Sequence, residues 1–194
     1  MTVLTETKKY TPEEYLALEE KAEFRSEFEN GEIVAMAGGS VNHARIIRNT
    51  DRLLSDVLNE NCESLTTDVK VRVENYRKFY YPDIIIFCGE PEFYQSRNDT
   101  ITNPVLIVEV LSDSTEAKDR GEKMLAYRTL ESLREYVLIS QTKPIVEQYL
   151  KDDNGNWIHK ATIGLKSSVE LTSLTIKLSL EKIYRRINFT EENL

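Results

Sequence analysis

The sequence predicts a mixed α/β fold, with helices on both sides of one central β-sheet. Two short runs of branched apolar residues, 84–87 and 106–111, have the length and composition of strands that are buried on both faces. Strong helix-start signals precede residues 12 and 41, and a third helical pattern follows the second buried run. Helices and strands therefore alternate along one chain, as in α/β proteins.

The N-terminal elements are predicted from their start and turn signals. Thr11-Pro12-Glu13-Glu14 combines an N-cap threonine, a proline at the first helical position and a glutamate three residues after the cap. A helix should therefore begin at Pro12 and end near Lys21. Asn30-Gly31 is a favoured two-residue turn and predicts a hairpin of strands 25–29 and 32–36.

A second, longer helix is expected after the Gly38-Gly39 break, with Ser40 as its cap, because apolar residues recur there at helical spacing. Residues 65–73 alternate as one strand, with Val69, Val71 and Val73 on one face and Lys70 and Arg72 on the other. The remaining expected elements are strands 82–87 and 105–111, a helix over 116–130, strands 135–140, 145–150 and 157–161, and a short helix over 180–186.

Length and composition indicate a single domain. The chain has 194 residues and a mass of 22.5 kDa, so we expect one domain over residues 11–190 after a flexible N-terminus of residues 1–10. The formal net charge of −8 argues against a dedicated nucleic-acid-binding protein, although the stretch from Thr66 to Phe79 is locally positive.

Neither a membrane span nor a signal segment is recognisable in the sequence. Cys62 and Cys88 are too few for a disulfide scaffold or a zinc knuckle. We therefore expect two buried free thiols in a cytoplasmic protein.

Two carboxylates lie in or next to the predicted core strands, where charged side chains are rare. Glu109 lies in the middle of an apolar run, where its burial is costly unless a metal ion, a lysine or a hydrogen-bond network holds it. Asp83, after Pro82, lies at the entrance of the other buried strand. Neighbouring strands could place both acids on one face, where they and the backbone carbonyl of Val110 would suit Mg²⁺ or Mn²⁺. Such an ion activates water for phosphodiester hydrolysis.

Three further side chains are candidates for the same site. Lys123 lies in the helix after the Glu109 strand, and its stem could bring the ammonium back to Glu109, whereas Lys118 is expected to be solvated. His43, near the start of the long helix, is either a catalytic residue or a capping and packing residue. Glu27 either completes a metal shell or pairs with Arg25 across solvent.

Other basic and aromatic residues could contact nucleic acid. Their side chains could hold phosphates or stack on bases, but solvated charges and tyrosines packed at strand ends are the more common explanation. The residues concerned are Arg45, Arg48, Lys70, Arg72, Arg77 and Lys78, with Tyr76, Tyr80 and Tyr81.

The pattern of these residues resembles a known family. The residues that carry the resemblance are Pro82-Asp83, Val108 to Ser112, Ser114-Thr115, Asp119, Lys123 and Tyr127, with Glu27, Asn30-Gly31-Glu32, Met36 and His43 towards the N-terminus. They look like the pattern of the Uma-two family of restriction-endonuclease-like proteins, over residues 10–149.

The resemblance implies the PD-(D/E)xK nuclease fold, a central mixed sheet flanked by helices. It also implies that Asp83 and Glu109 are ligands of a divalent metal. Lys123 would replace the lysine that usually stands two residues after the second acid, where this chain has Leu111.

Three functions are compatible with these features. The favoured one is a Mg²⁺- or Mn²⁺-dependent endonuclease that hydrolyses DNA, with Asp83 and Glu109 on the metal and Lys123 at the attacking water. The alternatives are a catalytically degenerate binding module on the same fold and a metal-dependent hydrolase of a small phosphorylated molecule. A homodimer is expected through the edge strand of the 145–161 hairpin.

Overall fold

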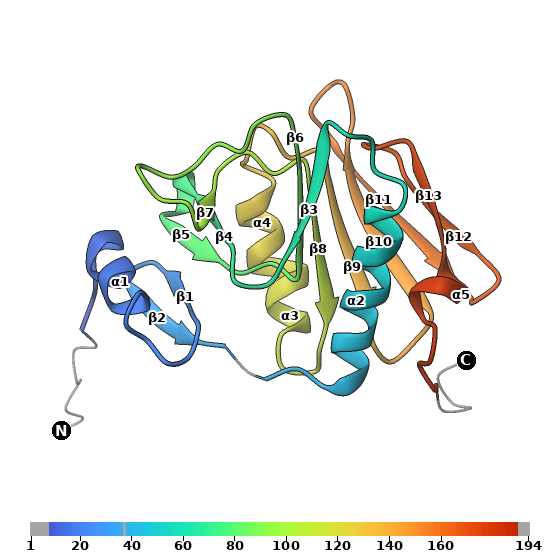
Figure 1. Ribbon diagram of the computed structural model, residues 1–194, viewed down its shortest axis with the longest axis horizontal. Helices are drawn as coiled ribbons and strands as arrows, with labels where there is room; N and C mark the ends of the chain where they lie inside the picture. Colours follow the sequence, from blue (N-terminus) through green and yellow to red (C-terminus); the bar gives the residue numbers. More distant parts are fainter. Residues whose placement is uncertain (1–7, 37, 190–194) are drawn as a thin grey trace.

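The strands of the computed structural model, which describes residues 8–36 and 38–189, form two large mixed sheets and a two-stranded ribbon (Figure 1). The mixed α/β class expected from the sequence is thus confirmed, but its strands are divided between two large sheets and not gathered in one. The expectations for residues 1–7 and for Thr190 lie outside the described residues.

The six-stranded sheet forms the centre of the molecule. Its order is β11-β10-β9-β8-β6-β3, antiparallel except for the parallel pair β8–β9. The strands are β3 (Cys62–Thr66), β6 (Ile84–Cys88), β8 (Leu106–Leu111), β9 (Glu135–Ser140), β10 (Ile145–Lys151) and β11 (Trp157–Ile163). The two apolar runs of the sequence are β6 and β8, and every residue of β8 is buried.

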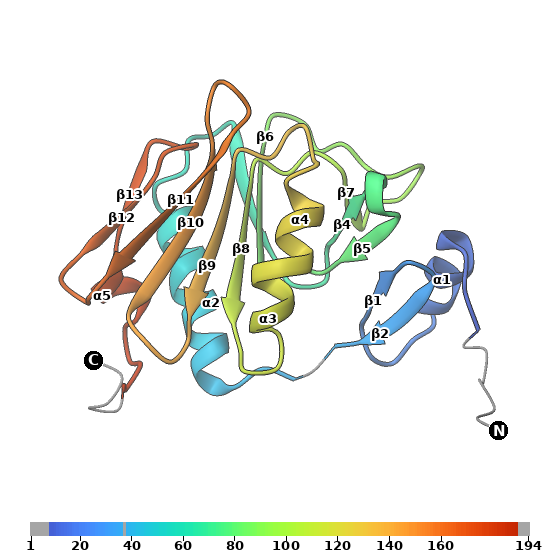
Figure 2. The same cartoon turned by 180° about the vertical axis from the view of Figure 1, so that it is seen from behind.

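Helices cover both faces of this sheet. The long helix α2 (Val41–Ser55) lies on one face (Figure 1), where Ile46 and Leu54 pack against β6, β8 and β9. The ribbon of β12 (Ser168–Leu171) and β13 (Ile176–Ser179) and the short helix α5 (Leu180–Ile183) complete the same core. The other face is covered by α3 (Glu116–Lys118) and α4 (Met124–Tyr127) (Figure 2).

The five-stranded sheet has the order β2-β1-β5-β4-β7 and holds the predicted N-terminal hairpin. Its strands are β1 (Ser26–Glu29), β2 (Glu32–Ala35), β4 (Lys70–Val73), β5 (Lys78–Tyr80) and β7 (Thr100–Ile101). A single-turn 3₁₀ helix, η1 (Glu74–Tyr76), connects β4 to β5. Helix α1 (Pro12–Glu19) starts with the predicted capping box of Thr11 and Glu14.

The single strand predicted over residues 65–73 is wrong, because it is two strands in different sheets. Thr67 and Asp68, both with positive φ, redirect the chain between β3 and β4. Lys70 and Arg72 are buried and not solvated: Lys70 pairs with Asp99, and Arg72 pairs with Glu74. Period-two alternation could not reveal this, because both sides of β4 are covered.

The helix expected over 116–130 is shorter and contains a π-helical turn. This turn, η2 (Asp119–Lys123), lies between α3 and α4, and Asp119 and Lys123 are its two buried residues. π turns are rare, and many of them occur at functional sites.

Two more differences lie toward the C-terminus. The ribbon β12–β13 was not predicted, and Glu135 secures its turn by accepting hydrogen bonds from the amide and the hydroxyl of Ser173. Within the described chain, β11 pairs only with β10, so the predicted edge strand is confirmed. Dimerisation through that edge stays a prediction.

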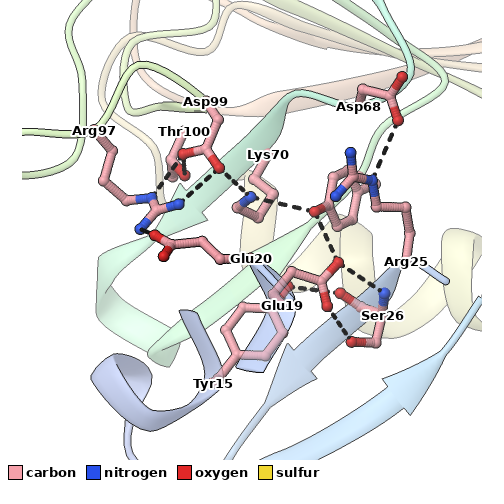
Figure 3. A network of polar contacts seen from close by, with 11 residues as sticks. Tyr15, Glu19, Glu20, Arg25, Ser26, Asp68, Lys70, Arg97, Asp99 and Thr100 are labelled. Atoms are coloured by element: carbon pink, nitrogen blue, oxygen red, sulfur yellow. Dashed lines mark hydrogen bonds and ion pairs between the residues drawn. The ribbon is translucent and has the colours of Figure 1, made fainter. Parts of the chain in front are cut away.

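A polar network joins the N-terminal segment to the rest of the molecule (Figure 3). The Tyr81 hydroxyl donates to Glu19 and accepts from buried Lys70, whose ammonium also contacts Asp99 at 2.7 Å. Asp99 in turn accepts two hydrogen bonds from Arg97, which also donates to Glu20, the residue after α1. Charge and hydrogen bonding thus add to the small aromatic core of Tyr15, Phe28 and Phe79.

The two cysteines form a disulfide, which corrects the expectation of free thiols. Cys62 and Cys88 are directly opposed in the antiparallel pair β3–β6 and are bonded to each other. Sequence spacing gave no indication of this, because their proximity depends on the strand register.

No helix in residues 8–36 and 38–189 is both long and apolar enough to cross a membrane.

Removal of the disulfide should lower stability. For two cysteines 26 residues apart, the double change Cys62→Ser and Cys88→Ser should decrease the free energy of unfolding by about 3 kcal/mol, measured by urea denaturation. Reduced wild-type protein should match the variant. Two thiols that react with a thiol reagent in the unreduced, denatured protein would contradict the disulfide.

The Asp99 network should make stability depend on pH. Hydrogen bonds and charge from Arg97 and Lys70 hold the pKa of Asp99 below its ordinary 3.8. Its stabilising contribution is therefore complete above pH 3.8 and is lost as the pH falls through the lower folded-state value. Asp99→Asn should lower the melting temperature at pH 7, and its difference from wild type should shrink below pH 3.8. A difference that grows in acid would contradict this assignment.

Candidate functional site

Asp83 and Glu109 are brought together by the register of β6 and β8. Ile84 pairs with Val108 and Ile85 with Ile107, so one further step along the ladder sets Asp83 opposite Glu109. Opposed residues of an antiparallel pair point to the same face. Asp83 is also fixed by the amide of Val110, which donates to its Oδ2 at 2.7 Å. The sequence-based expectation that both acids share one face is met.

Both carboxylates line a cavity of about 210 Å³ at the end of these strands. The β1–β2 hairpin, the start of α2 and the helical segment after β8 enclose it. Its lining includes all five predicted site residues, Glu27, His43, Asp83, Glu109 and Lys123, together with the backbone position Val110.

Lys123 connects three acids inside this site. Its ammonium lies 2.9 Å from Glu109 Oε1, 3.2 Å from Glu27 Oε1 and 3.1 Å from Asp119 Oδ1. Burial lowers the pKa of Lys123, but the three carboxylates outweigh it and raise the pKa above its ordinary value. The predicted approach of Lys123 to Glu109 is therefore present, and the lysine stays charged.

Glu109 is the acid whose surroundings least favour ionisation. Burial raises its pKa well above 4.5; Lys123 opposes this, whereas the charges of Asp119, Asp83 and Glu27 add to it. Its Oε1 accepts from Lys123 and from the hydroxyl of Tyr127, while Oε2 takes part in neither contact. Negative charge in this cluster therefore exceeds what Lys123 alone compensates.

The positions of Glu27 and Lys118 differ from the solvated positions that the sequence favoured. Glu27 is buried and accepts from Lys118 Nζ at 2.7 Å, whereas Arg25 pairs with Asp68. Burial raises the pKa of Glu27, but Lys123 and Lys118 lower it below 4.5. In an α-helix, side chains five residues apart point about 140° apart; the π turn lets Lys118 and Lys123 contact the same carboxylate.

His43 pairs with Asp83 and does not act only as a helix cap. Ser40 caps α2 by accepting from the His43 amide, while the imidazole Nε2 lies 3.3 Å from Asp83 Oδ2. Burial lowers the pKa of His43, but the hydrogen bond and charge of Asp83 raise it above 6.5. A Cβ on Gly39 would lie 2.9 Å from His43 Nδ1, so a larger residue there would force this ring to shift.

The other basic and aromatic candidates divide into buried and exposed groups. Lys70, Arg72 and Lys78 are buried in ion pairs, and Tyr80 and Tyr81 are also buried. Tyr76 and Arg77 are exposed and lie outside the cavity. Among these, only Tyr81 lines the site.

The donor set fits a hard divalent cation. Asp83 and Glu109 each have an oxygen, Oδ1 and Oε2, outside the contacts described above, and Mg²⁺ and Mn²⁺ take oxygen ligands. The excess negative charge around Glu109 favours a further cation. Within residues 8–36 and 38–189, however, no three His, Cys, Asp or Glu side chains are already grouped as metal ligands.

A family model described as "Uma2: Putative restriction endonuclease" matches residues 12–181. The chain belongs to the Uma2 family. Two proteins of Synechocystis sp., named "Uncharacterized protein sll1609" and "Uncharacterized protein slr1290", are each 36% identical to this chain. The alignments cover 91% and 93% of this chain and 100% and 94% of those proteins.

A similar fold is seen in a crystal structure from Anabaena variabilis, described as a putative nuclease belonging to DUF820. The TM-score is 0.72 at 18% identity, over 90% of this chain and 97% of that chain. At this identity the similarity supports the fold, and the resemblance noted from the sequence is confirmed by the family match.

Some contributors to this Uma2 site were not assigned a role from the sequence. Asp119 forms an ion pair with Lys123, and the Tyr127 hydroxyl donates to Glu109. Gly39 leaves space for the His43 ring. Asp119 and Tyr127 follow Glu109 at spacings that place them on the covering helix, so their roles could have been predicted from the sequence. The contribution of Gly39 depends on a contact that no spacing indicates.

Removal of the Lys123 ammonium should destabilise the protein strongly. Lys123→Met keeps the length of the side chain but leaves the buried acids Glu109 and Asp119 without their cation, which should cost about 3–5 kcal/mol in urea denaturation. Lys166→Met, at an exposed lysine, is the matched control and should leave stability within about 0.5 kcal/mol. Equal stability of the two variants would show that Lys123 is not structurally required.

Proposed function

We propose that this protein is a divalent-metal-dependent endonuclease that hydrolyses phosphodiester bonds of DNA. The observation that carries the proposal is the pair Asp83, directly before β6, and Glu109 of β8, which line one cavity, with Lys123 at 2.9 Å from Glu109. Membership of a family described as "Putative restriction endonuclease" adds to it.

The ligands in this proposal are Asp83, Glu109 and the carbonyl of Val110, and the ion is Mg²⁺ or Mn²⁺. Such an ion supplies Lewis acidity and a water of lowered pKa. All three residues line the cavity, so a phosphate at its mouth would reach them.

The protein's own side chains would then orient the reacting groups. Lys123, held by three carboxylates and charged, would orient the attacking water and offset negative charge that develops on the phosphate. His43 would keep Asp83 in place through the contact at 3.3 Å. Glu27, also within the cavity, would help to keep the Lys123 ammonium in position.

Electrostatics make substrate binding depend on the metal. Glu27, Asp83, Glu109 and Asp119 line the cavity beside only two lysines, Lys118 and Lys123, and the whole chain has a net charge of −8. A phosphate backbone would be repelled by this wall until a cation reduces its charge. DNA binding should accordingly be weak in the presence of a chelator.

One specific observation favours a second candidate, a metal-dependent hydrolase of a small phosphorylated molecule. The cavity, at about 210 Å³, is small, and the acidic surface suits a nucleotide better than a long polyanion. Competition between nucleotides and duplex DNA distinguishes the two.

Mn²⁺ titration calorimetry tests the proposal, with Asp83→Asn and Glu109→Gln as site variants and Glu63→Gln, at an exposed position in β3, as control. Wild type and control should bind Mn²⁺ and cleave duplex DNA, and the site variants should lose at least about tenfold in affinity and about 100-fold in cleavage. Glu109→Gln should still fold, because Lys123 keeps Glu27 and Asp119 as partners.

Wild-type protein that binds Mn²⁺ but cleaves nucleotides only would move the assignment to the small-molecule hydrolase. If wild-type protein does not bind Mn²⁺ at all, the endonuclease proposal fails and the remaining assignment is a catalytically degenerate binding module.

A further inference from the structure

The loop between β8 and the helical segment collects hydroxyl groups at the cavity. Residues 112–115 form a tight turn in which the amides of Thr115 and Glu116 both donate to the carbonyl of Ser112. The turn is thus held by its backbone, and the hydroxyls of Ser112, Ser114 and Thr115 are not needed to close it.

These three hydroxyls converge. Ser112 Oγ lies 3.1 Å from Ser114 Oγ and 2.9 Å from Thr115 Oγ1. Each hydroxyl has one donor hydrogen, and the two contacts use two of the three. At least one O–H donor is therefore left for a ligand.

The three hydroxyl-bearing residues line the site cavity, and the acid of the same loop does not. Ser112, Ser114 and Thr115 line the cavity that holds Asp83 and Glu109, whereas Asp113 is exposed and outside its lining. Lys118 lines the same cavity; its ammonium contacts Glu27 and Glu29, and an ammonium has three donors. The lining therefore combines donors from residues 112–118 with the acceptors of Asp83 and Glu109.

A phosphate group suits such a combination, because it is a strong acceptor that can share a cation with carboxylates. We infer that the hydroxyl cluster of Ser112, Ser114 and Thr115, with Lys118, binds a non-bridging oxygen of a phosphate group of the substrate. This inference rests on the proposed function and adds to it a substrate-binding role for the loop. The hydroxyls are neutral and Lys118 is already paired with Glu27 and Glu29, so these donors would hold the anion beside four carboxylates only when the cation is bound.

The test uses Thr115→Val and Ser114→Ala, with Thr142→Val as the matched control. Thr142 also has a hydroxyl within 3.3 Å of a serine, at an exposed place outside the cavity. Binding of a fluorescent duplex and of thymidine monophosphate is measured by anisotropy and calorimetry in Ca²⁺ and in chelator, and cleavage is measured in Mn²⁺. Calcium takes the same oxygen ligands as magnesium with looser geometry.

Each cluster variant should weaken Ca²⁺-dependent binding about tenfold, because a hydrogen bond to a charged group is lost. The melting temperatures of all three variants should stay as in wild type. Thr142→Val should also bind both probes as wild type does. Cleavage at saturating substrate should fall less than binding, as expected of a residue that positions the phosphate.

The outcomes separate this inference from the function on which it rests. Variants that bind as wild type does, while wild type cleaves DNA, would overturn the phosphate subsite and leave the endonuclease. Hydroxyl-dependent binding of the nucleotide without DNA cleavage would support the subsite and overturn the DNA assignment. A wild-type protein that binds neither probe in Ca²⁺ would overturn both.

Discussion

The contact of one buried ammonium with three carboxylates is the constraint on which this structure depends. Lys123 lies in the segment that covers the sheet, Glu109 in the central strand β8, and Glu27 in the N-terminal hairpin. An unpaired buried charge costs several kcal/mol, so the lysine is tolerated only when the acids are in place around it. Correct docking of the hairpin and of the helical segment is therefore coupled to assembly of the site.

The N-terminal hairpin is attached mainly by charge and hydrogen bonding. Its apolar cluster around Tyr15 and Phe28 is small, whereas an ion pair with Lys118 joins it to the helical segment. Hydrogen bonds from Ser26 to Glu19 connect it to the polar network of Figure 3. Such contacts are directional, and they hold Glu27 beside the cavity without filling it. The excess of carboxylates lowers stability, whereas under the proposed function the same charge would bind a divalent cation.

Much of the local structure was predictable, because its causes lie close together in the sequence. The capping box of Thr11, the Asn30-Gly31 turn and the Ser40 cap each form where expected. The two central strands were recognisable because few segments are so uniformly apolar. Within them Asp83 and Glu109 stood out as unusual, and the pairing of adjacent strands then set them opposite each other.

By itself, then, the sequence determined the fold class and singled out Asp83, Glu109 and Lys123 as candidate site residues, since periodicity and the cost of burying a charge are local properties. Tertiary structure decided the rest. Lys70 is buried because β4 is covered on both sides, and Cys62 meets Cys88 because of strand register. Likewise, the contact of Lys118 with Glu27, which the π turn permits, joins residues 91 positions apart in the sequence. Contacts between distant segments arise only after packing, which no local pattern records.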